Sequence, residues 1–168
     1  DGTYSFDPNG DFDDLAVGES ATTTISYQVS DGNGGTDTAS ITVTVSGAND
    51  VPVAAADSDT VTENAVTDGN VLTNDTDADG NDILTVSQIN GDPASVGTPV
   101  AGANGGQFTV NGDGTYSFDP NGDFDDLAVG ESRTTRVNYQ VSDGNGGTDT
   151  AVLTVTVNGT NDVPTAGD

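Results

Sequence analysis

The sequence contains no cysteine, histidine, methionine, tryptophan or lysine, and its only cationic side chains are Arg133 and Arg136. Without cysteine the chain has no disulfide, no zinc–thiolate site and no thiol nucleophile. No apolar run approaches the roughly 20 residues that a membrane-spanning helix needs. These absences leave hydrophobic packing and bound ions as the means of holding the chain together.

Acidic residues dominate the charge, with 28 aspartates and glutamates against two arginines and a formal net charge of −26. Nucleic acids and anionic membrane surfaces attract basic proteins, so we expect neither nucleic-acid binding nor membrane insertion. The complementary partner is a cation. Because the available ligands are oxygen atoms, the sequence favours a hard ion, and we predict calcium as the cofactor.

Catalysis would have to rely on carboxylates, because histidine, cysteine and lysine are missing. Glycosidases work in this way, with a pair of acidic side chains facing each other across the substrate. Here the carboxylates fall in segments typical of surface turns rather than of a pocket. We therefore predict that the protein is not an enzyme.

The chain repeats itself with an offset of 112 residues. Residues 1–50 return at 113–162 with only eight differences, and the arginines are among them because Ala21 and Thr24 become Arg133 and Arg136. This pattern is typical of a tandem array. We expect a fragment of such an array, with residues 1–48 as the C-terminal half of a preceding repeat, 49–160 as a complete repeat and 161–168 as the linker to the next.

Apolar residues alternate with polar ones in several segments, as in Val137, Tyr139 and Val141. Such a period of two indicates strands with one buried and one solvated face, and Asn-Gly pairs supply turns. The sequence predicts an all-β fold, an immunoglobulin-like β-sandwich in tandem repeats of about 112 residues. We expect strands near 59–64, 83–89, 106–110, 114–118, 133–142 and 148–158, with a further strand between 93 and 101.

Two nearly identical segments compete for residues 49–112. A strand of about 10 residues spans roughly 33 Å, so the linker SGANDVP is too short to bring the chain back onto the first copy. We therefore expect residues 49–112 to pair with 113–160. Residues 1–48 would then keep open strand edges, through which a homodimer could form.

The segment TNDTDADGND, residues 73–82, concentrates four aspartates, which are Asp75, Asp77, Asp79 and Asp82. Their spacing before Gly80 resembles the first half of an EF-hand loop, but the position that requires a bidentate glutamate is Val86. The loop must therefore obtain its remaining oxygen ligands from elsewhere in the chain. We predict that this loop is the leading calcium site.

Two further acidic segments leave two interpretations open. DPNGDFDD at 119–126 and SDGNGGTD at 142–149 offer carboxylate and amide oxygens for a metal. Aspartate and asparagine are also favoured in plain turns, because they bond their own backbone and tolerate left-handed geometry. The candidate ligands of these segments are Asp119, Asp123, Asp125, Asp126, Asp143, Asn145 and Asp149.

The phrases FDDLAVGES and NYQVSDGNGGTDTAVLTVTVNGTND resemble the VCBS-type repeats of RTX-like bacterial surface adhesins, and more distantly the cadherin-like sandwich. In cadherin-like proteins, calcium lies between consecutive domains. The resemblance implies an extracellular protein at the bacterial cell surface, exported by a type I system, whose partners are calcium ions and neighbouring repeats of the same protein.

The resemblance also implies a set of metal ligands beyond the acidic loop. They come from the Asn-Asp linkers, an early glutamate, the DxD pair, the GES segment and the last turn. The GES segment does not reproduce the Leu-Asp-Arg-Glu motif of cadherins. The implied ligands are Asn49, Asp50, Asn161, Asp162, Glu63, Asp77, Asp79, Glu131, Glu19, Asp143 and Asp31.

Two functions follow as hypotheses. The first is a calcium-stabilised spacer repeat of a large secreted adhesin, which projects a binding tip from the cell in adhesion and biofilm formation. The alternative is a calcium-dependent adhesin module that binds carbohydrate or protein. The aromatic residues are four tyrosines and five phenylalanines, mostly on the predicted buried face of strands, so the sequence offers no aromatic sugar platform and favours the spacer.

Overall fold

The protein was analysed as a computed structural model, which describes residues 2–164. The chain divides into two compact units, one made of residues 1–50 and 78–82, the other of residues 51–77 and those from 83 onward. The elements are β1 (Ser20–Ser30), β2 (Thr36–Ser46), β3 (Asp57–Thr62), β4 (Thr67–Asn70), β5 (Thr85–Ile89), η1 (Pro93–Ser95), β6 (Val100–Ala101), β7 (Gln107–Val110), β8 (Thr115–Asp119), β9 (Ser132–Ser142) and β10 (Thr148–Asn158).

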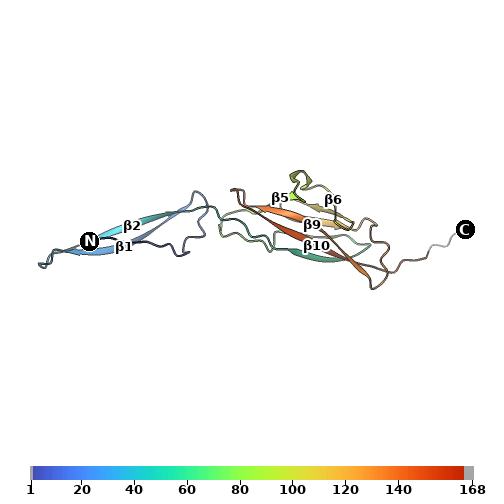
Figure 1. Cartoon of the computed structure of the whole chain (residues 1–168), viewed down its shortest axis with the longest axis horizontal. Helices are drawn as coiled ribbons and strands as arrows, with labels where there is room; N and C mark the ends of the chain where they lie inside the picture. The colour runs from blue at the N-terminus through green and yellow to red at the C-terminus, as the bar shows by residue number, and fades with distance from the viewer. Residues whose placement is uncertain (1, 165–168) are drawn as a thin grey trace. The chain divides into compact units, whose positions relative to one another are not determined.

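The second unit consists of two four-stranded sheets (Figure 1). One sheet has the order β3-β10-β9-β5, in which β3 runs parallel to β10 and the other pairs are antiparallel. The other has the order β4-β8-β7-β6 and is antiparallel throughout. This arrangement confirms the predicted all-β fold.

A single hydrophobic core fills the space between these sheets. The alternating residues predicted to point inward are buried, and Val137, Tyr139 and Val141 of β9 are each at most 1% exposed. Phe118 of β8 packs at 4.5 Å between ring centroids from Phe108 of β7. Each such side chain adds about 1.5–3 kcal/mol to the stability of the folded state when it is fully buried. Because this packing fixes the strands, it also fixes where the loops at their ends lie.

The predicted strands are present with shifted ends, and one strand was not predicted. β4 has the sequence TDGN, in which Asp, Gly and Asn are depleted in strands and only Thr is favoured, so the sequence carries little signal for it. It forms because Gly69 lets the Tyr116 ring approach closely; a Cβ at Gly69 would lie 2.7 Å from that ring. The strand expected between 93 and 101 is only the two residues of β6, preceded by the short helix η1.

The intervening segment, residues 51–112, pairs through two of its strands with the C-terminal copy of the repeated sequence, residues 113–162, which is the pairing predicted for residues 49–112 with 113–160. Its strand β3 lies along β10 and its strand β5 along β9. The predicted linker 161–168 has no helix or strand through residue 164, and residues 165–168 lie outside the described part of the chain. In the region that the structure describes, no helix is long and apolar enough to cross a membrane.

The N-terminal copy, residues 1–50, forms the hairpin β1–β2 in the register of β9–β10. Residues 3–7 have the same sequence as β8, TYSFD, but form no strand. In the second unit β8 is held between β4 and β7, and the first unit supplies no such partners among its described residues. Identical sequences therefore differ in structure because their tertiary contacts differ.

The Tyr139 hydroxyl fixes the segment that leads into β3. It lies 2.8 Å from the Asp57 carboxylate and 2.8 Å from the carbonyl oxygen of Ala55. Burial raises the pKa of Tyr139, and the hydrogen bond to Asp57 raises it further. Burial also raises the pKa of Asp57, although the hydrogen bond from Tyr139 opposes this. The core strand β9 thus holds the chain just before β3.

We predict that Tyr139→Phe lowers the free energy of unfolding by about 1–3 kcal/mol, because it leaves partly buried acceptors without their donor. The matched control is Tyr27→Phe at the equivalent position of the N-terminal copy, where the ring is 44% exposed. That change should shift stability by less than about 0.5 kcal/mol. Urea unfolding followed by circular dichroism measures both, and equal effects would contradict the assigned role.

Candidate metal centre

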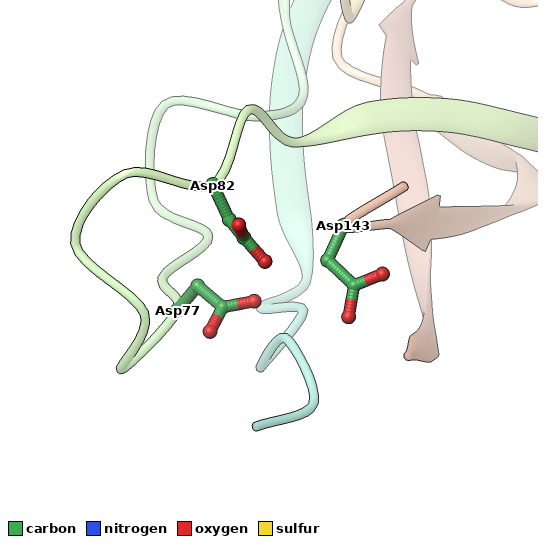
Figure 2. Close-up of side chains that lie close together, drawn as sticks. All are labelled: Asp77, Asp82 and Asp143. Carbon is green, nitrogen blue, oxygen red and sulfur yellow. The ribbon is translucent and has the colours of Figure 1, made fainter. Parts of the chain in front are cut away.

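Three carboxylates converge where the acidic loop meets the turn after β9. Oxygen atoms of Asp77, Asp82 and Asp143 all lie within 4.8 Å of one another. Figure 2 shows the carboxylates of Asp77 and Asp82, from the loop, extending toward Asp143 of the turn. Asp143 is buried and the other two are half-buried. The sequence predicted all three as ligands, and the structure brings them together.

The turn between β9 and β10 sets the position of Asp143. Its carboxylate accepts hydrogen bonds from the backbone N–H groups of Asn145 at 2.7 Å, Gly146 at 3.0 Å and Gly147 at 2.9 Å. Gly144 and Gly146 have φ of +84° and +112°, values that glycine adopts without strain. The SDGNGG sequence therefore builds a rigid turn that holds one carboxylate beside the acidic loop.

Like charges at this separation repel. Two carboxylates 4.8 Å apart cost about 0.9 kcal/mol in bulk water and more in a less polar environment. The chain has only two cationic side chains, and Arg133 forms its salt bridge with Asp126, at 2.6 Å. A set of carboxylate oxygens converging on one point suits calcium, which takes six to eight oxygen ligands. The donor set fits that ion.

Further predicted ligands are gathered within the first unit. Asp79 is buried, and its carboxylate accepts the backbone N–H of Asp50 at 2.9 Å. The Asn81 side-chain amide donates to the Glu19 carboxylate at 2.6 Å. Asn49 donates to the carbonyl oxygen of Asp50 at 2.7 Å. The linker NDVP and the GES segment of the N-terminal copy are therefore both in contact with loop residues 78–82.

Asp75 has a different environment from the other loop aspartates. One of its oxygens accepts the backbone N–H of Ala55 at 2.7 Å, and the other is buried with no hydrogen-bond partner among the described residues. Burial raises the pKa of Asp75, and the nearby charge of Asp149 adds to this effect. The group formed by Asp77, Asp82 and Asp143 does not include it. Asp75 instead fixes the segment before β3.

Glu63 occupies a separate place in the second unit, just after β3. It is 3% exposed, and one carboxylate oxygen accepts the backbone N–H of Thr160 at 2.6 Å and its hydroxyl at 2.7 Å. The other oxygen is buried without a hydrogen-bond partner in the described chain. A buried carboxylate oxygen left in this way is costly, and a cation would satisfy it.

Three further predicted ligands are Glu131, Asn161 and Asp162. The carbonyl oxygen of Glu131 accepts the N–H of Gly159 at 3.0 Å, and its carboxylate accepts the N–H of Ala128 at 3.0 Å. The neighbouring residues Asn161 and Asp162 are exposed. Glu131 therefore contacts Gly159 through its backbone, and Glu63 contacts the next residue, Thr160, through its carboxylate. No sequence pattern indicated that Thr160 would bind Glu63.

Asp31 is the counterpart of Asp143 in the N-terminal copy. It is exposed, and the N–H groups of Asn33 and Gly35 lower its pKa by hydrogen bonding to the carboxylate. The described contacts do not join Asp31 to any other predicted ligand. The two turns have the same sequence, but Asp143 is buried and Asp31 is exposed. Asp143 is buried because the acidic loop lies beside it.

In the segment DPNGDFDD, Asp119 makes the local contact expected for turn chemistry, whereas Asp123 and Asp126 contact residues farther along the chain. Asp119 accepts the N–H of Asn121 at 2.8 Å, and Asp123 accepts the N–H of Gly106 at 2.8 Å. Asp126 pairs with Arg133. Asp149, from the third acidic segment, accepts the N–H of Ala54 at 2.9 Å. These side chains hold backbone in place, whereas Asp77, Asp82 and Asp143 converge on one another.

Comparisons with known proteins agree with this interpretation of the fold. The profile of the family described as bacterial cadherin-like domain matches residues 49–159, and that of the bacterial Ig domain matches residues 1–44. The chain is 35% identical over 175 residues to a protein named calcium-binding lectin RapA2 from Rhizobium johnstonii (strain DSM 114642 / LMG 32736 / 3841). The match covers 95% of this chain and 72% of that protein.

Solved structures of similar proteins include two protocadherins. The chain is 16% identical to protocadherin gammaB7 EC3-6, with a TM-score of 0.43, and 16% identical to the extracellular cadherin domains 3-6 of protocadherin gamma B2, with a TM-score of 0.40. Each match covers 83% of this chain and 32% of the other. The chain therefore spans about a third of the length of either structure.

We predict that Asp82→Asn raises the unfolding free energy by about 1–2 kcal/mol in the presence of a chelator, because it removes two repulsive pairs. With calcium in excess the variant should be less stable than the unchanged protein, since it loses a charged ligand. The control is Asp68→Asn, on the exposed face of β4, which should change neither value appreciably. Thermal unfolding with calcium and with chelator measures the effect. If Asp82→Asn is more stable than the unchanged protein in both conditions, or less stable in both, the prediction is wrong.

Proposed function

Because the chain belongs to the bacterial cadherin-like domain family, we propose that it is a calcium-stabilised structural repeat of an extracellular adhesin. The observation that carries this proposal is the convergence of Asp77, Asp82 and Asp143 in a chain with almost no cationic side chains. An acidic group of this kind needs a positive charge from solution, and calcium is the hard divalent ion that extracellular modules use.

The proposed ligands form two sets. Asp77, Asp82 and Asp143 would bind the ion at the acidic loop, and the residues in contact with loop residues 78–82 are further candidates, namely Asn49, Asp50, Asp79 and Glu19. A second ion would lie at Glu63, whose buried oxygen without a partner supports this assignment. Glu131, Asn161 and Asp162 would complete that site.

Calcium binding of ordinary strength would be enough to control folding. Extracellular calcium modules bind with dissociation constants of about 10⁻⁴–10⁻³ M. At a free ion concentration about 100 times the dissociation constant, each site adds roughly 2.7 kcal/mol to the folded state. Net stabilities are about 5–15 kcal/mol, so two sites account for a large fraction of the total. The chain would then fold fully only where calcium is abundant, that is, outside the cell.

We infer a spacer role from the repetition of the sequence. Near-identity of residues 1–50 and 113–162 favours a mechanical unit over a unique binding site, because a spacer gains length from each copy. In this proposal the 112-residue repeats are of the VCBS type found in RTX-like adhesins. They would be exported by a type I system and would hold an adhesive tip away from the cell during adhesion and biofilm formation.

A second candidate function is carbohydrate binding that depends on calcium. It is favoured by the 35% identity to a protein named calcium-binding lectin. Against it, the aromatic residues of the second unit are committed to the core, including Phe108, Phe118 and Tyr139. A glycan array probed with and without calcium distinguishes the two candidates. In neither do we propose catalysis, because the acidic side chains serve turns and the candidate metal sites.

We expect calcium to raise the melting temperature and, by stiffening the linker between repeats, to increase the maximum dimension measured by small-angle scattering. A chelator should reverse both changes, because it restores repulsion among the carboxylates. Magnesium at the same concentration is the control for ionic strength, since that ion is smaller and gives up its water ligands reluctantly. If neither quantity responds to calcium, the proposed role as a calcium-stiffened spacer is wrong.

The double variant Asp77→Asn with Asp79→Asn should lose most of the calcium-induced rise in melting temperature. The matched control is Asp68→Asn with Asp125→Asn, which removes the same charge from two exposed positions outside the acidic loop. Calorimetric titration measures the loss of binding directly. Unchanged calcium affinity in the first variant would exclude the acidic loop as the site.

A further inference from the structure

A polar hollow lies beside the first half of β9, where β5 does not reach. β5 pairs with β9 only from Tyr139 to Ser142, so the edge of β9 before these residues has no neighbouring strand on that side. The hollow has a volume of about 290 Å³, and its lining residues are Ala103, Asn104, Thr134, Thr135, Arg136 and Thr154. None of them is a candidate metal ligand.

A loop before β7 forms one wall of this hollow. The backbone N–H of Ala103 donates to the carbonyl oxygen of Arg136 at 3.1 Å. The side-chain amide of Asn104 donates to the carbonyl oxygen of Thr134 at 2.8 Å. The backbone N–H of Asn104 donates to the Thr135 hydroxyl at 3.2 Å. The loop therefore occupies the edge of β9 in place of a strand, and these hydrogen bonds fix its position.

The solvent face of the sheet forms the other side of the hollow. Thr134 and Arg136 alternate along β9 with buried residues, so their side chains point to solvent. Thr154 of β10 lies directly opposite Arg136 and points the same way. Residues paired in this manner have Cβ atoms about 4.5–5.5 Å apart, so one small ligand reaches both side chains.

Arg136 is the cation of this hollow, and it has no acidic partner in the described part of the chain. Arg133, the other arginine, forms the salt bridge with Asp126, and its guanidinium carbon lies 5.6 Å from the centroid of the Phe124 ring. Among the described residues, the Arg136 side chain forms neither an ion pair nor a hydrogen bond. In a chain with 28 acidic residues, this guanidinium is available to an anion from outside.

The N-terminal copy shows what the arginine changes. Thr24 occupies the equivalent position, and its hydroxyl forms a hydrogen bond of 3.1 Å with that of Thr42 on the neighbouring strand. Thr42 corresponds to Thr154, whereas Thr24 is replaced by Arg136. The Thr154 hydroxyl has no intramolecular hydrogen bond to a described residue. The replacement therefore leaves a guanidinium and a hydroxyl next to each other, both able to bind a ligand.

We propose that this hollow binds a sugar acid, that is, a single sugar residue that carries a carboxylate. The guanidinium presents a planar fork of donors that matches a carboxylate. The hydroxyls of Thr134 and Thr154 donate or accept, and the side-chain oxygen of Asn104 accepts, so together they suit the hydroxyl groups of a sugar. Small-molecule sites begin at about 300 Å³, so the hollow accommodates one sugar ring.

The charge and chemistry of the hollow favour this ligand over two other anions. A phosphate carries about 1.5–2 negative charges against one for a carboxylate, and the net charge of −26 opposes the more highly charged ligand. An acidic side chain of another protein offers acceptors only, so it would leave the Asn104 oxygen without a donor. Because the lining residues include no carboxylate, this site does not require calcium and is independent of the proposed metal sites.

Nuclear magnetic resonance tests the proposal on the full chain, because each of the two arginines gives its own Nε–H signal. In the presence of a chelator, glucuronate or galacturonate should shift the Arg136 Nε–H signal and the backbone amides of Ala103 and Asn104 in a saturable way. The Arg133 signal should not move. Glucose and acetate, which supply the hydroxyls and the carboxylate separately, should each bind at least tenfold more weakly.

Arg136→Gln should weaken binding of the sugar acid at least tenfold, whereas the matched control Arg133→Gln should bind as the unchanged protein does. Both variants remove one positive charge, so the control reveals any effect of net charge alone. Because Arg136 is exposed, its replacement leaves the fold intact, which the remaining amide signals verify.

Four results would overturn the proposal. They are the absence of a saturable shift with both sugar acids, binding of acetate or glucose as tight as that of the sugar acid, and normal binding by Arg136→Gln. The fourth is binding that occurs with calcium but disappears with chelator, because the ligand would then bind at a metal centre.

Discussion

Repulsion among carboxylates that the chain itself cannot neutralise is the constraint on which this structure depends. With 28 acidic residues and two arginines, most negative charge must be solvated, bonded to backbone N–H groups, or balanced from outside. Asp143 and Asp123 illustrate the second solution, since both accept backbone N–H groups. For Asp77, Asp82 and Asp143, whose oxygens lie within 4.8 Å of one another, we propose the third solution, a cation from solution.

Hydrophobic packing decides where these carboxylates meet. The sandwich of residues 51–160 brings the acidic loop beside the turn after β9, because β5 follows the loop and pairs with β9. The two copies of the repeat show what packing contributes. TYSFD is a strand at 115–119 and irregular at 3–7, and the turn aspartate is buried at Asp143 but exposed at Asp31. Local sequence is therefore sufficient for the hairpin and the turn. The strand at TYSFD and the burial of the turn aspartate occur only in the copy that packs against the intervening segment.

Alternation of apolar and polar residues was sufficient to predict the all-β fold and the long strands, because β9 and β10 each bury one face. It could not reveal β4, which depends on Tyr116 packing against Gly69. At the acidic loop, spacing predicted Asp77 and Asp82, while both the SDGNGGTD segment and the resemblance to cadherin-like repeats predicted Asp143. Spacing also predicted Asp75, of which one carboxylate oxygen accepts the N–H of Ala55, a contact that only the folded chain determines.

The central claim is that calcium supplies the charge that the acidic loop lacks. A crystal structure grown with excess calcium tests it most directly, through anomalous scattering at the loop. The account predicts an ion in contact with oxygens of Asp77, Asp82 and Asp143 at about 2.3–2.6 Å, with six to eight oxygen ligands in total. Ordered water alone around these three side chains, under saturating calcium, would contradict it.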